Sequence, residues 1–191
     1  MIDLPLSIEE RRILLRLARR SIEMAINARS LPRLILSDYS APLREQGASF
    51  VTLTDRGELR GCIGALEAYQ ALVQDVCEHA AAAATEDYRF SPVQPFELPR
   101  LKIEISRLTP PEPLKYTSPE DLLAQLRPLQ DGVVVKDMGK RATFLPQVWQ
   151  NIPDPATFLN HLCQKMGAPA DLWRTKPVHV YTYQVEEFAE E

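Results

Sequence analysis

Cysteine and histidine are scarce in this chain, and the spacings that usually accompany metal sites and disulfides are missing. The 191 residues contain three cysteines and three histidines, with no Cys-x-x-Cys and no His-x-x-x-His pair. A disulfide framework or a zinc site would need more of these residues at regular spacing. We therefore expect reduced thiols and no metal. The beginning of the chain also lacks the pattern of a secretory signal, which favours a cytoplasmic protein.

Long apolar segments and cofactor-binding loops are also missing. No apolar run approaches the ~20 residues that a membrane-spanning helix needs, so we expect no membrane insertion. There is no Gly-x-Gly-x-x-Gly loop, no P-loop and no Gly-x-Ser-x-Gly turn, so the sequence predicts no cofactor. A net charge of −4 and a pI near 5.5 argue against a general nucleic-acid binder, because such proteins are normally basic.

Positive charge is nevertheless concentrated near the N-terminus. It forms either a solvated helix face or a docking patch for an acidic partner, and the sequence alone leaves both interpretations open. The residues are Arg11, Arg12, Arg16, Arg19 and Arg20.

The segment that carries these arginines predicts a long amphipathic helix. Ser7 and Glu10 have the spacing of a capping box at a helix start. Apolar residues then recur at helical spacing as far as Ala25. Pro32 marks the expected end.

A β-hairpin is predicted next, around Asp55–Gly57. We expect a three-residue loop with Gly57 at positive φ. In that register Thr52 lies opposite Arg60, and Phe50 lies opposite Cys62. Because side chains alternate along a strand, Arg60 and Cys62 share one face. The opposite, core-facing side is expected to hold Val51, Leu53, Leu59 and Ile63.

The rest of the chain predicts further helices and strands without regular βαβ alternation. A helix within 69–90 carries Cys77 on its apolar stripe and His79 on the surface. The later elements are a strand Leu101–Leu108, a helix Pro119–Leu126, a strand Gly132–Val135 with a hairpin at Asp137–Lys140, a helix within 154–167 and a strand within 177–188. Dominant hairpins indicate an α+β fold with antiparallel sheets and packed helices. At this length we expect one domain spanning residues 1–191.

The stretch "LRGCIG", Leu59–Gly64, is the strongest candidate for chemistry. Arg60 and Cys62 are two residues apart on one strand, ~6.6–6.8 Å between Cα atoms. A guanidinium at that distance favours the reactive thiolate. The alternative is that Cys62 is a small packed side chain. Gly61 and Gly64 leave room for a ligand or another backbone to approach.

A catalytic partner for Cys62 is not evident. A cysteine nucleophile usually has a histidine base, and none of His79, His161 and His179 is linked to Cys62 by spacing. Cys163 lies on an apolar helix stripe, which indicates a core position.

Six ordered motifs resemble the AMMECR-type domain, whose prokaryotic members are called AmmeMemoRadiSam system protein A. They are "LRGCIG", "DYRF", "ELPRLKIEIS", "DGVVV", "FLPQV" and "LCQKMG", which together cover nearly the whole chain. This resemblance implies a larger and a smaller subdomain, each with an antiparallel sheet, around a cleft near the LRGCIG strand. It also implies that the protein acts together with a Memo-like protein and a radical SAM enzyme, and it implies no established reaction.

Carried over to this sequence, the resemblance indicates a binding surface formed by two motifs. Arg60 and Arg89 would recognise a small anion if they converge, since guanidinium groups suit carboxylate and phosphate. The alternative for Arg89 is an ion pair that holds a helix end to the next loop. Tyr88 and Met166 depart from the family pattern. The residues implicated are Leu59, Arg60, Gly61, Cys62, Ile63, Gly64, Asp87, Arg89 and Phe90.

Two functions follow from these observations. The first is a binding or accessory component that acts with the two partners named above. The second is an enzyme in which Cys62 is the nucleophile and a small anion is the substrate.

Overall fold

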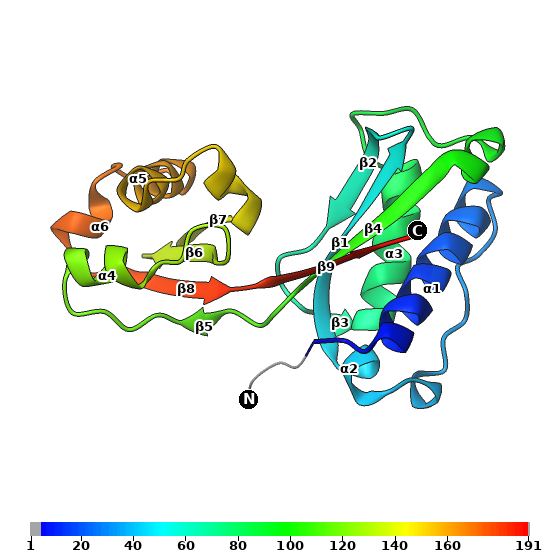
Figure 1. The fold of residues 1–191 in the computed structure, drawn as a ribbon, viewed down its shortest axis with the longest axis horizontal. Coiled ribbons are helices and arrows are strands. Elements are labelled where there is room, and N and C mark those ends of the chain that lie inside the picture. Colours follow the sequence, from blue (N-terminus) through cyan, green and yellow to red (C-terminus); the bar gives the residue numbers. More distant parts are fainter. Residues whose placement is uncertain (1–4, 191) are drawn as a thin grey trace. The chain divides into compact units, whose positions relative to one another are not determined.

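The computed structural model describes residues 5–190, which form two compact units, each with its own antiparallel sheet (Figure 1). The first unit comprises Met1–Leu108 and Glu186–Glu191, and the second comprises Thr109–Val185. Each unit has a separate hydrophobic core. The predicted α+β class with antiparallel sheets is confirmed.

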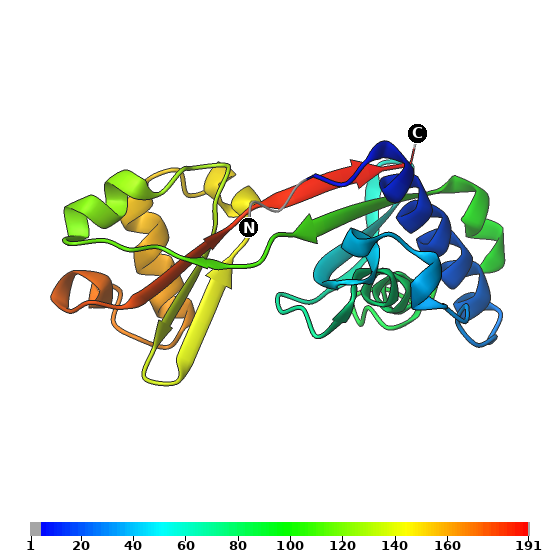
Figure 2. The same ribbon diagram turned by 90° about the horizontal axis from the view of Figure 1, so that it is seen from below.

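In the first unit, a sheet is covered on one face by the two long helices, α1 and α3 (Figures 1 and 2). The strand order is β2-β1-β4-β9, and the short β3 also pairs with β1. Its elements are α1 (Ile8–Ile26), η1 (Leu36–Asp38), α2 (Ala41–Arg44), β1 (Gln46–Asp55), β2 (Glu58–Gly64), β3 (Gln70–Ala71), α3 (Leu72–Thr85), η2 (Pro95–Arg100), β4 (Leu101–Leu108) and β9 (Val185–Ala189).

The start of α1 follows the predicted capping box. The Ser7 side chain accepts a hydrogen bond from the Glu10 backbone N–H, and the Glu10 carboxylate accepts one from the Ser7 N–H at 2.7 Å. The helix ends at Ile26, earlier than Pro32 suggested. Ala28 has φ 53°, a left-handed conformation that stops a helix before the proline is reached.

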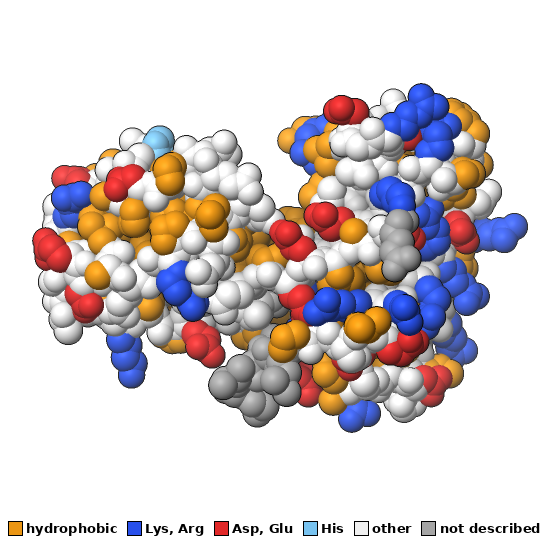
Figure 3. Space-filling model, viewed as in Figure 1, with side chains coloured by type: hydrophobic (Ala, Val, Ile, Leu, Met, Phe, Trp, Pro, Cys, Tyr) orange, Lys and Arg blue, Asp and Glu red, His pale blue; other side chains and the backbone are white. Residues whose placement is uncertain are grey.

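The arginines along α1 are partly occupied by acidic side chains from elsewhere in the unit. Arg11 pairs with Glu186 at 2.8 Å, and Arg19 pairs with Glu190. Both acids belong to the C-terminal segment, so these pairs fasten β9 to the first helix. The basic side chains are visible over α1 in Figure 3.

The β1–β2 hairpin differs from its predicted register. Asp55 pairs directly with Glu58, which leaves a two-residue loop in which Arg56 and Gly57 both have positive φ, 55° and 88°. Two-residue hairpin loops with positive φ at both positions match the twist of the strands. The predicted three-residue loop is therefore wrong, and Arg56 takes a conformation that the sequence did not reveal.

An irregularity in β2 produces two further corrections. The register shifts between Leu53 and Thr54, so Arg60 is the extra residue, and Cys62 pairs with Thr52 rather than with Phe50. A bulge reverses the side-chain alternation on either side of it. As a result Leu59, predicted to face the core, is 43% exposed.

The second unit has a four-stranded sheet in the order β5-β8-β6-β7. Its core contains a stacked aromatic pair, Trp149 and Phe158, with ring centroids 3.7 Å apart. The predicted hairpin after β6 is confirmed, with Asp137 paired to Lys140. The elements are β5 (Glu112–Pro113), α4 (Pro119–Gln125), β6 (Gly132–Asp137), β7 (Lys140–Phe144), η3 (Pro146–Gln150), α5 (Pro155–Lys165), α6 (Leu172–Thr175) and β8 (His179–Tyr183).

The predicted final strand is in fact two strands that belong to different sheets. β8 pairs with β5 and β6, whereas β9 pairs with β4, and Gln184 separates them. The Gln184 backbone exchanges hydrogen bonds with Thr109, at 2.9 Å each way. Side-chain alternation carries no information about which strand lies alongside, so the change of sheet left no signal in the sequence.

The predictions for buried cysteines and for the surface histidine had different outcomes. Cys77 and Cys163 are 2% and 0% exposed, as predicted, and burial raises the pKa of both thiols. His79 is only 7% exposed, which contradicts the predicted surface position. Its Nδ1 atom lies 3.1 Å from the Asp75 carboxylate one helical turn earlier, so the buried histidine has a polar partner within the core.

Candidate functional site

Strand β2 carries the LRGCIG stretch and lies at an edge of the first unit's sheet. Its glycines face protein atoms at very short range. A Cβ atom at Gly61 would lie 2.1 Å from the carbonyl oxygen of Ala83 in α3, and one at Gly64 would lie 2.4 Å from the Phe50 ring. What approaches these glycines is therefore the chain's own helix and neighbouring strand. A ligand-binding role for either glycine stays a prediction.

Small residues on α3 complete this close contact. Ala80, Ala83 and Ala84 are buried against the sheet. A bulkier residue at Gly61 would push β2 away from the helix, because protein interiors have few voids that could absorb extra volume.

Cys62 occupies the opposite face of β2. Its side chain is half-buried, and the Thr52 hydroxyl donates a weak hydrogen bond to Sγ at 3.4 Å. Thr52 pairs with Cys62 on one side and with Glu104 of β4 on the other. Residues directly opposite each other project from the same face of a sheet. Cys62, Thr52 and Glu104 therefore form a polar row across three strands.

Glu104 is the acidic member of this row. Partial burial of its carboxyl group, together with the negative charge of Glu187, raises its pKa. Glu104 is exposed and faces away from the core. Its alignment with Cys62 follows from the strand pairing, which the sequence did not indicate.

The backbone of Cys62 is satisfied by two side chains from the DYRF segment. Its N–H donates to the Asp87 carboxylate at 2.8 Å, and its carbonyl oxygen accepts from the Arg89 guanidinium at 3.3 Å. The Arg89 guanidinium in turn donates two hydrogen bonds to Asp87, at 2.9 and 2.6 Å, and the Arg89 backbone N–H donates a third at 3.2 Å. The interpretation of Arg89 as one half of an ion pair is therefore confirmed. The sequence did not predict that this pair would also bind the backbone of β2.

Asp87 is the buried centre of this arrangement, with 5% of its surface exposed. The Arg89 guanidinium, followed by the Cys62 N–H, holds the pKa of its carboxyl group far below the usual range. The same pair raises the pKa of Arg89. Both groups remain charged at every ordinary pH.

Arg60 is bound to a different carboxylate. Its Nε and Nη2 atoms donate to Glu97 of η2 at 2.8 and 3.2 Å. Both side chains are mostly buried, and Arg60 lowers the pKa of Glu97. Arg60 and Arg89 thus each have a carboxylate of their own, where the sequence had suggested a shared anion.

The aromatic residues of the second motif differ in exposure. Phe90 is partly buried, and the Arg89 guanidinium lies over its ring at 5.5 Å from the centroid. Tyr88 is 94% exposed. Tyr88 lies between Asp87 and Arg89 in the sequence, so the ion pair joins the two residues that flank it.

Catalytic partners for the thiol are not found among residues 5–190. Within that range no hydrogen bond or ion pair joins a histidine to Cys62, and no group of three or more His, Cys, Asp and Glu side chains is placed to hold a metal ion. His79 is engaged with Asp75 in α3, and His161 and His179 are exposed. The arrangement presents a partly exposed thiol on a rigid surface.

Sequence reasoning missed the role of Glu97 and the pairing of Thr52 with Cys62. Glu97 could have been noticed because Gln94 and Glu97 have capping-box spacing, and both reciprocal hydrogen bonds form at the start of η2. Nothing in the sequence pointed to Thr52, since its position opposite Cys62 depends on the bulge.

In the part of the chain that the structure describes, no helix is both long and apolar enough to cross a bilayer.

Comparisons with known proteins agree over nearly the full length of the chain. A protein of Thermofilum pendens is 40% identical, covering 97% of this chain and 92% of the relative, and one of Methanothermobacter thermautotrophicus is 39% identical, covering 98% and 97%. The crystal structure of an uncharacterized protein from Pyrococcus horikoshii superposes with a TM-score of 0.81 at 33% identity, covering 97% of this chain and 94% of that one. The sequence model of the AMMECR1 family matches residues 15–188. The chain therefore belongs to the AMMECR1 family.

Proposed function

We propose that this protein is a binding or accessory component that docks through the surface built by its LRGCIG and DYRF motifs. The observation that carries the proposal is the Asp87–Arg89 ion pair. Its two charged side chains form hydrogen bonds with the backbone N–H and carbonyl of Cys62. Such bonds are roughly twice as strong as neutral ones. They make this edge of the sheet a fixed surface.

The arginines of the two motifs support a structural role more than a catalytic one. Arg60 and Arg89 each donate two hydrogen bonds to an internal carboxylate, Glu97 and Asp87 respectively. An anionic substrate would meet two guanidinium groups whose positive charges are already balanced by a bound carboxylate. The attraction that either arginine offers to a second anion is correspondingly weaker.

Exposed apolar side chains lie next to the ion-paired residues in the sequence. Leu59 precedes Arg60 and is 43% exposed; Tyr88 lies between Asp87 and Arg89 and is 94% exposed; Phe96 precedes Glu97 and is 70% exposed. Exposed large apolar side chains are typical of contact sites, and tyrosine is enriched among the residues that dominate binding energy.

The partners that we propose are those implied by the family resemblance, a Memo-like protein and a radical SAM enzyme. The test measures binding of each purified partner to the full chain by biolayer interferometry. Tyr88→Ala should weaken binding about tenfold or more, as expected for a central interface tyrosine. Tyr69→Ala is the matched control, because Tyr69 is another exposed tyrosine of the same unit, at 56% exposure, and should leave the affinity unchanged.

Two results would contradict this proposal. One is that neither partner binds the unmodified chain, and the other is that the Tyr88→Ala and Tyr69→Ala variants bind equally well. Circular dichroism of both variants shows whether a loss of binding reflects a loss of folding.

The alternative function is an enzyme with Cys62 as nucleophile on a small anionic substrate. It is favoured by the partial exposure of Cys62 and by the Thr52 hydroxyl 3.4 Å from its sulfur atom. The pH dependence of alkylation, read by peptide mass spectrometry, tests it. Buried Cys77 and Cys163 are internal controls and should react much more slowly. A midpoint for Cys62 well below the ~8.5 of a free thiol would favour the enzyme over the accessory role.

A further inference from the structure

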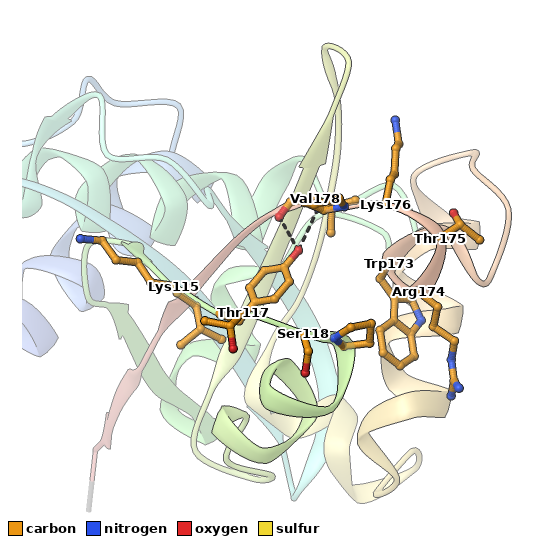
Figure 4. A pocket seen from close by; sticks show the side chains of 12 residues that line it. Lys115, Thr117, Ser118, Trp173, Arg174, Thr175, Lys176 and Val178 are labelled. Carbon is orange, nitrogen blue, oxygen red and sulfur yellow. Dashed lines mark hydrogen bonds between the residues drawn. The ribbon is translucent and has the colours of Figure 1, made fainter.

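The second unit contains a cavity of about 420 Å³ that none of the motifs above includes (Figure 4). Two segments line it, residues 114–119 before and into α4, and residues 173–178, which run from within α6 to just before β8. The size is within the range of small-molecule sites in proteins, ~300–1,000 Å³. All of the lining residues belong to one unit, so the cavity is a property of that unit alone.

The cavity opens where two paired strands separate. The last backbone hydrogen bond between the segments joins the Leu114 N–H to the Val180 carbonyl at 2.9 Å. Beyond it the Tyr116 hydroxyl takes the place of a strand: it donates to the Val178 carbonyl and accepts from the Val178 N–H, both at 2.8 Å. Figure 4 shows this pair of bonds. They fix the Tyr116 ring as one wall of the cavity.

Apolar groups form most of the remaining surface. Trp173 is 1% exposed and is held by a hydrogen bond from its Nε1 to Asn160 at 2.9 Å. Leu114, Pro119 and Pro177 are at least partly exposed along the walls. The site is therefore apolar and held in shape, as preformed ligand pockets usually are.

The charged groups around the cavity are all positive. Lys115, Arg174 and Lys176 are among the lining residues, and no aspartate or glutamate is. Lys176 is paired with Asp137 at 2.9 Å. Within residues 5–190, neither Lys115 nor Arg174 is in a salt bridge, and Figure 4 shows the Lys115 side chain pointing away from the cavity.

Arg174 is the better placed of the two for recognition. Its guanidinium lies over the Trp173 ring, 4.4 Å from the centroid, and a contact with the ring face leaves N–H groups of the planar guanidinium free to donate to a ligand. Outside the cavity, the pKa values of Glu120 and Asp154 are lowered mainly by hydrogen bonds at the starts of their own helices, and further by the charge of Arg174. These two acids compete with any ligand for Arg174.

We propose that this cavity binds a small organic anion, with its apolar body against the walls formed by Leu114, Tyr116 and the prolines. Its carboxylate, sulfonate or phosphate group contacts Arg174. The site is separate from the docking surface of the first unit and does not depend on the function proposed for it.

The test is a titration of the isotope-labelled full chain with 2-naphthoate, followed by NMR. The chain has two tryptophans, and both indole N–H groups are hydrogen-bonded within the second unit, Trp173 to Asn160 and Trp149 to the Asp131 carbonyl. Binding should shift the Trp173 indole signal and the Val178 amide signal saturably. The Trp149 indole signal serves as the internal reference and should stay in place.

Ligand and protein variants then separate the charge from the apolar contact. Neutral 2-naphthalenemethanol should bind more weakly than the anion, and added salt should reduce the difference. Arg174→Gln should weaken naphthoate binding about two- to fivefold, the effect of one exposed ion pair. Glu120→Gln should tighten it, because a competing carboxylate is removed. Arg12→Gln, an exposed arginine of the first unit, is the control and should change nothing.

Any one of four results would overturn the proposal. The Trp173 and Trp149 signals would move together without saturation, the neutral analogue would bind as well as the anion, or Arg174→Gln would bind like the unmodified chain. Binding of an acidic peptide in place of naphthoate would also overturn it, because the site would then recognise a protein segment.

Discussion

The carboxylate of Asp87 accepts a hydrogen bond from the backbone N–H of Cys62 at 2.8 Å, and Arg89, its ion-pair partner, donates to the carbonyl of the same residue. These side chains occupy the positions that a neighbouring strand would take at the edge of the sheet. Unpaired edges tend to recruit strands from other molecules. The DYRF segment thus completes the edge that the LRGCIG strand leaves open.

Replacing Asp87 tests this edge. Asp87→Asn removes the charge that holds Arg89 and weakens the bond to Cys62. We expect the free energy of unfolding to fall by about 2 kcal/mol, the typical contribution of a hydrogen bond to a charged group. Urea unfolding measures it. Asp38→Asn, at an exposed aspartate of the same unit, should change stability little; an equal loss in both variants would contradict the role assigned to Asp87.

The same carboxylate predicts how stability depends on pH. The pKa of Asp87 is depressed in the folded protein, and that of Glu97 is also lowered. A depressed pKa stabilises the fold above the unfolded value, ~3.9 for aspartate, and the contribution is lost as the pH falls toward the folded value. The unfolding free energy should therefore decrease as the pH drops below about 4. The pKa of Glu104 is raised in the folded protein, so its protonation stabilises the fold as the pH falls. This effect offsets part of the stability lost through Asp87 and Glu97.

Urea midpoints at neutral pH and at pH ~3 check this dependence. The difference in unfolding free energy between the unmodified chain and Asp87→Asn should become smaller in acid, because the Asp87 carboxyl group is then protonated in the unfolded state. A gap that stays constant from neutral pH to acid would show that Asp87 does not carry the effect.

Gly61 is predicted to tolerate no side chain. The Cβ of Gly61→Ala would lie 2.1 Å from the Ala83 carbonyl oxygen, which belongs to helix backbone and cannot rotate away. We expect a loss of about 2–3 kcal/mol, as for an overpacked core, measured by urea unfolding. Leu59→Ala on the same strand is the comparison, since Leu59 is 43% exposed and should cost less. Equal stability of Gly61→Ala and the unmodified chain would mean that β2 and α3 can separate freely.

His79 is predicted to be structural. Asp75 is fully buried; one of its oxygens has no hydrogen-bond partner among the described residues, and the other contacts Ser49 at 2.6 Å and His79 at 3.1 Å. His79→Ala leaves this carboxyl group with the Ser49 hydroxyl alone. We expect the free energy of unfolding to fall by about 3 kcal/mol, because the remaining member of a buried polar pair is then buried without its partner.

Two further variants make the His79 measurement specific. His161→Ala, at an exposed histidine, should leave the urea midpoint unchanged. Combining His79→Ala with Asp75→Ala should recover part of the stability, since the unpaired carboxyl group is then gone. A double variant less stable than the sum of the single changes would argue against a pair.

The sequence by itself determined the local elements and the fold class. The capping box at Ser7, the strand Leu101–Leu108 and the hairpin at Asp137–Lys140 were all predicted from patterns within a few residues and are present. Helix starts, alternating strands and short turns depend on interactions between neighbours along the chain. The ordered motifs were likewise enough to indicate the family.

The tertiary structure decided which residues meet. The bulge at Arg60 placed Cys62 opposite Thr52, and the contact of Asp87 with Cys62 joined segments 25 residues apart. The sequence showed that Arg60 and Arg89 carry charge, and only the fold assigned each its own carboxylate. Strand register, bulges and long-range ion pairs arise from packing between distant segments, and no short-range pattern records them. For that reason the sequence identified the candidate site, while the structure established which of its groups are already bound to one another.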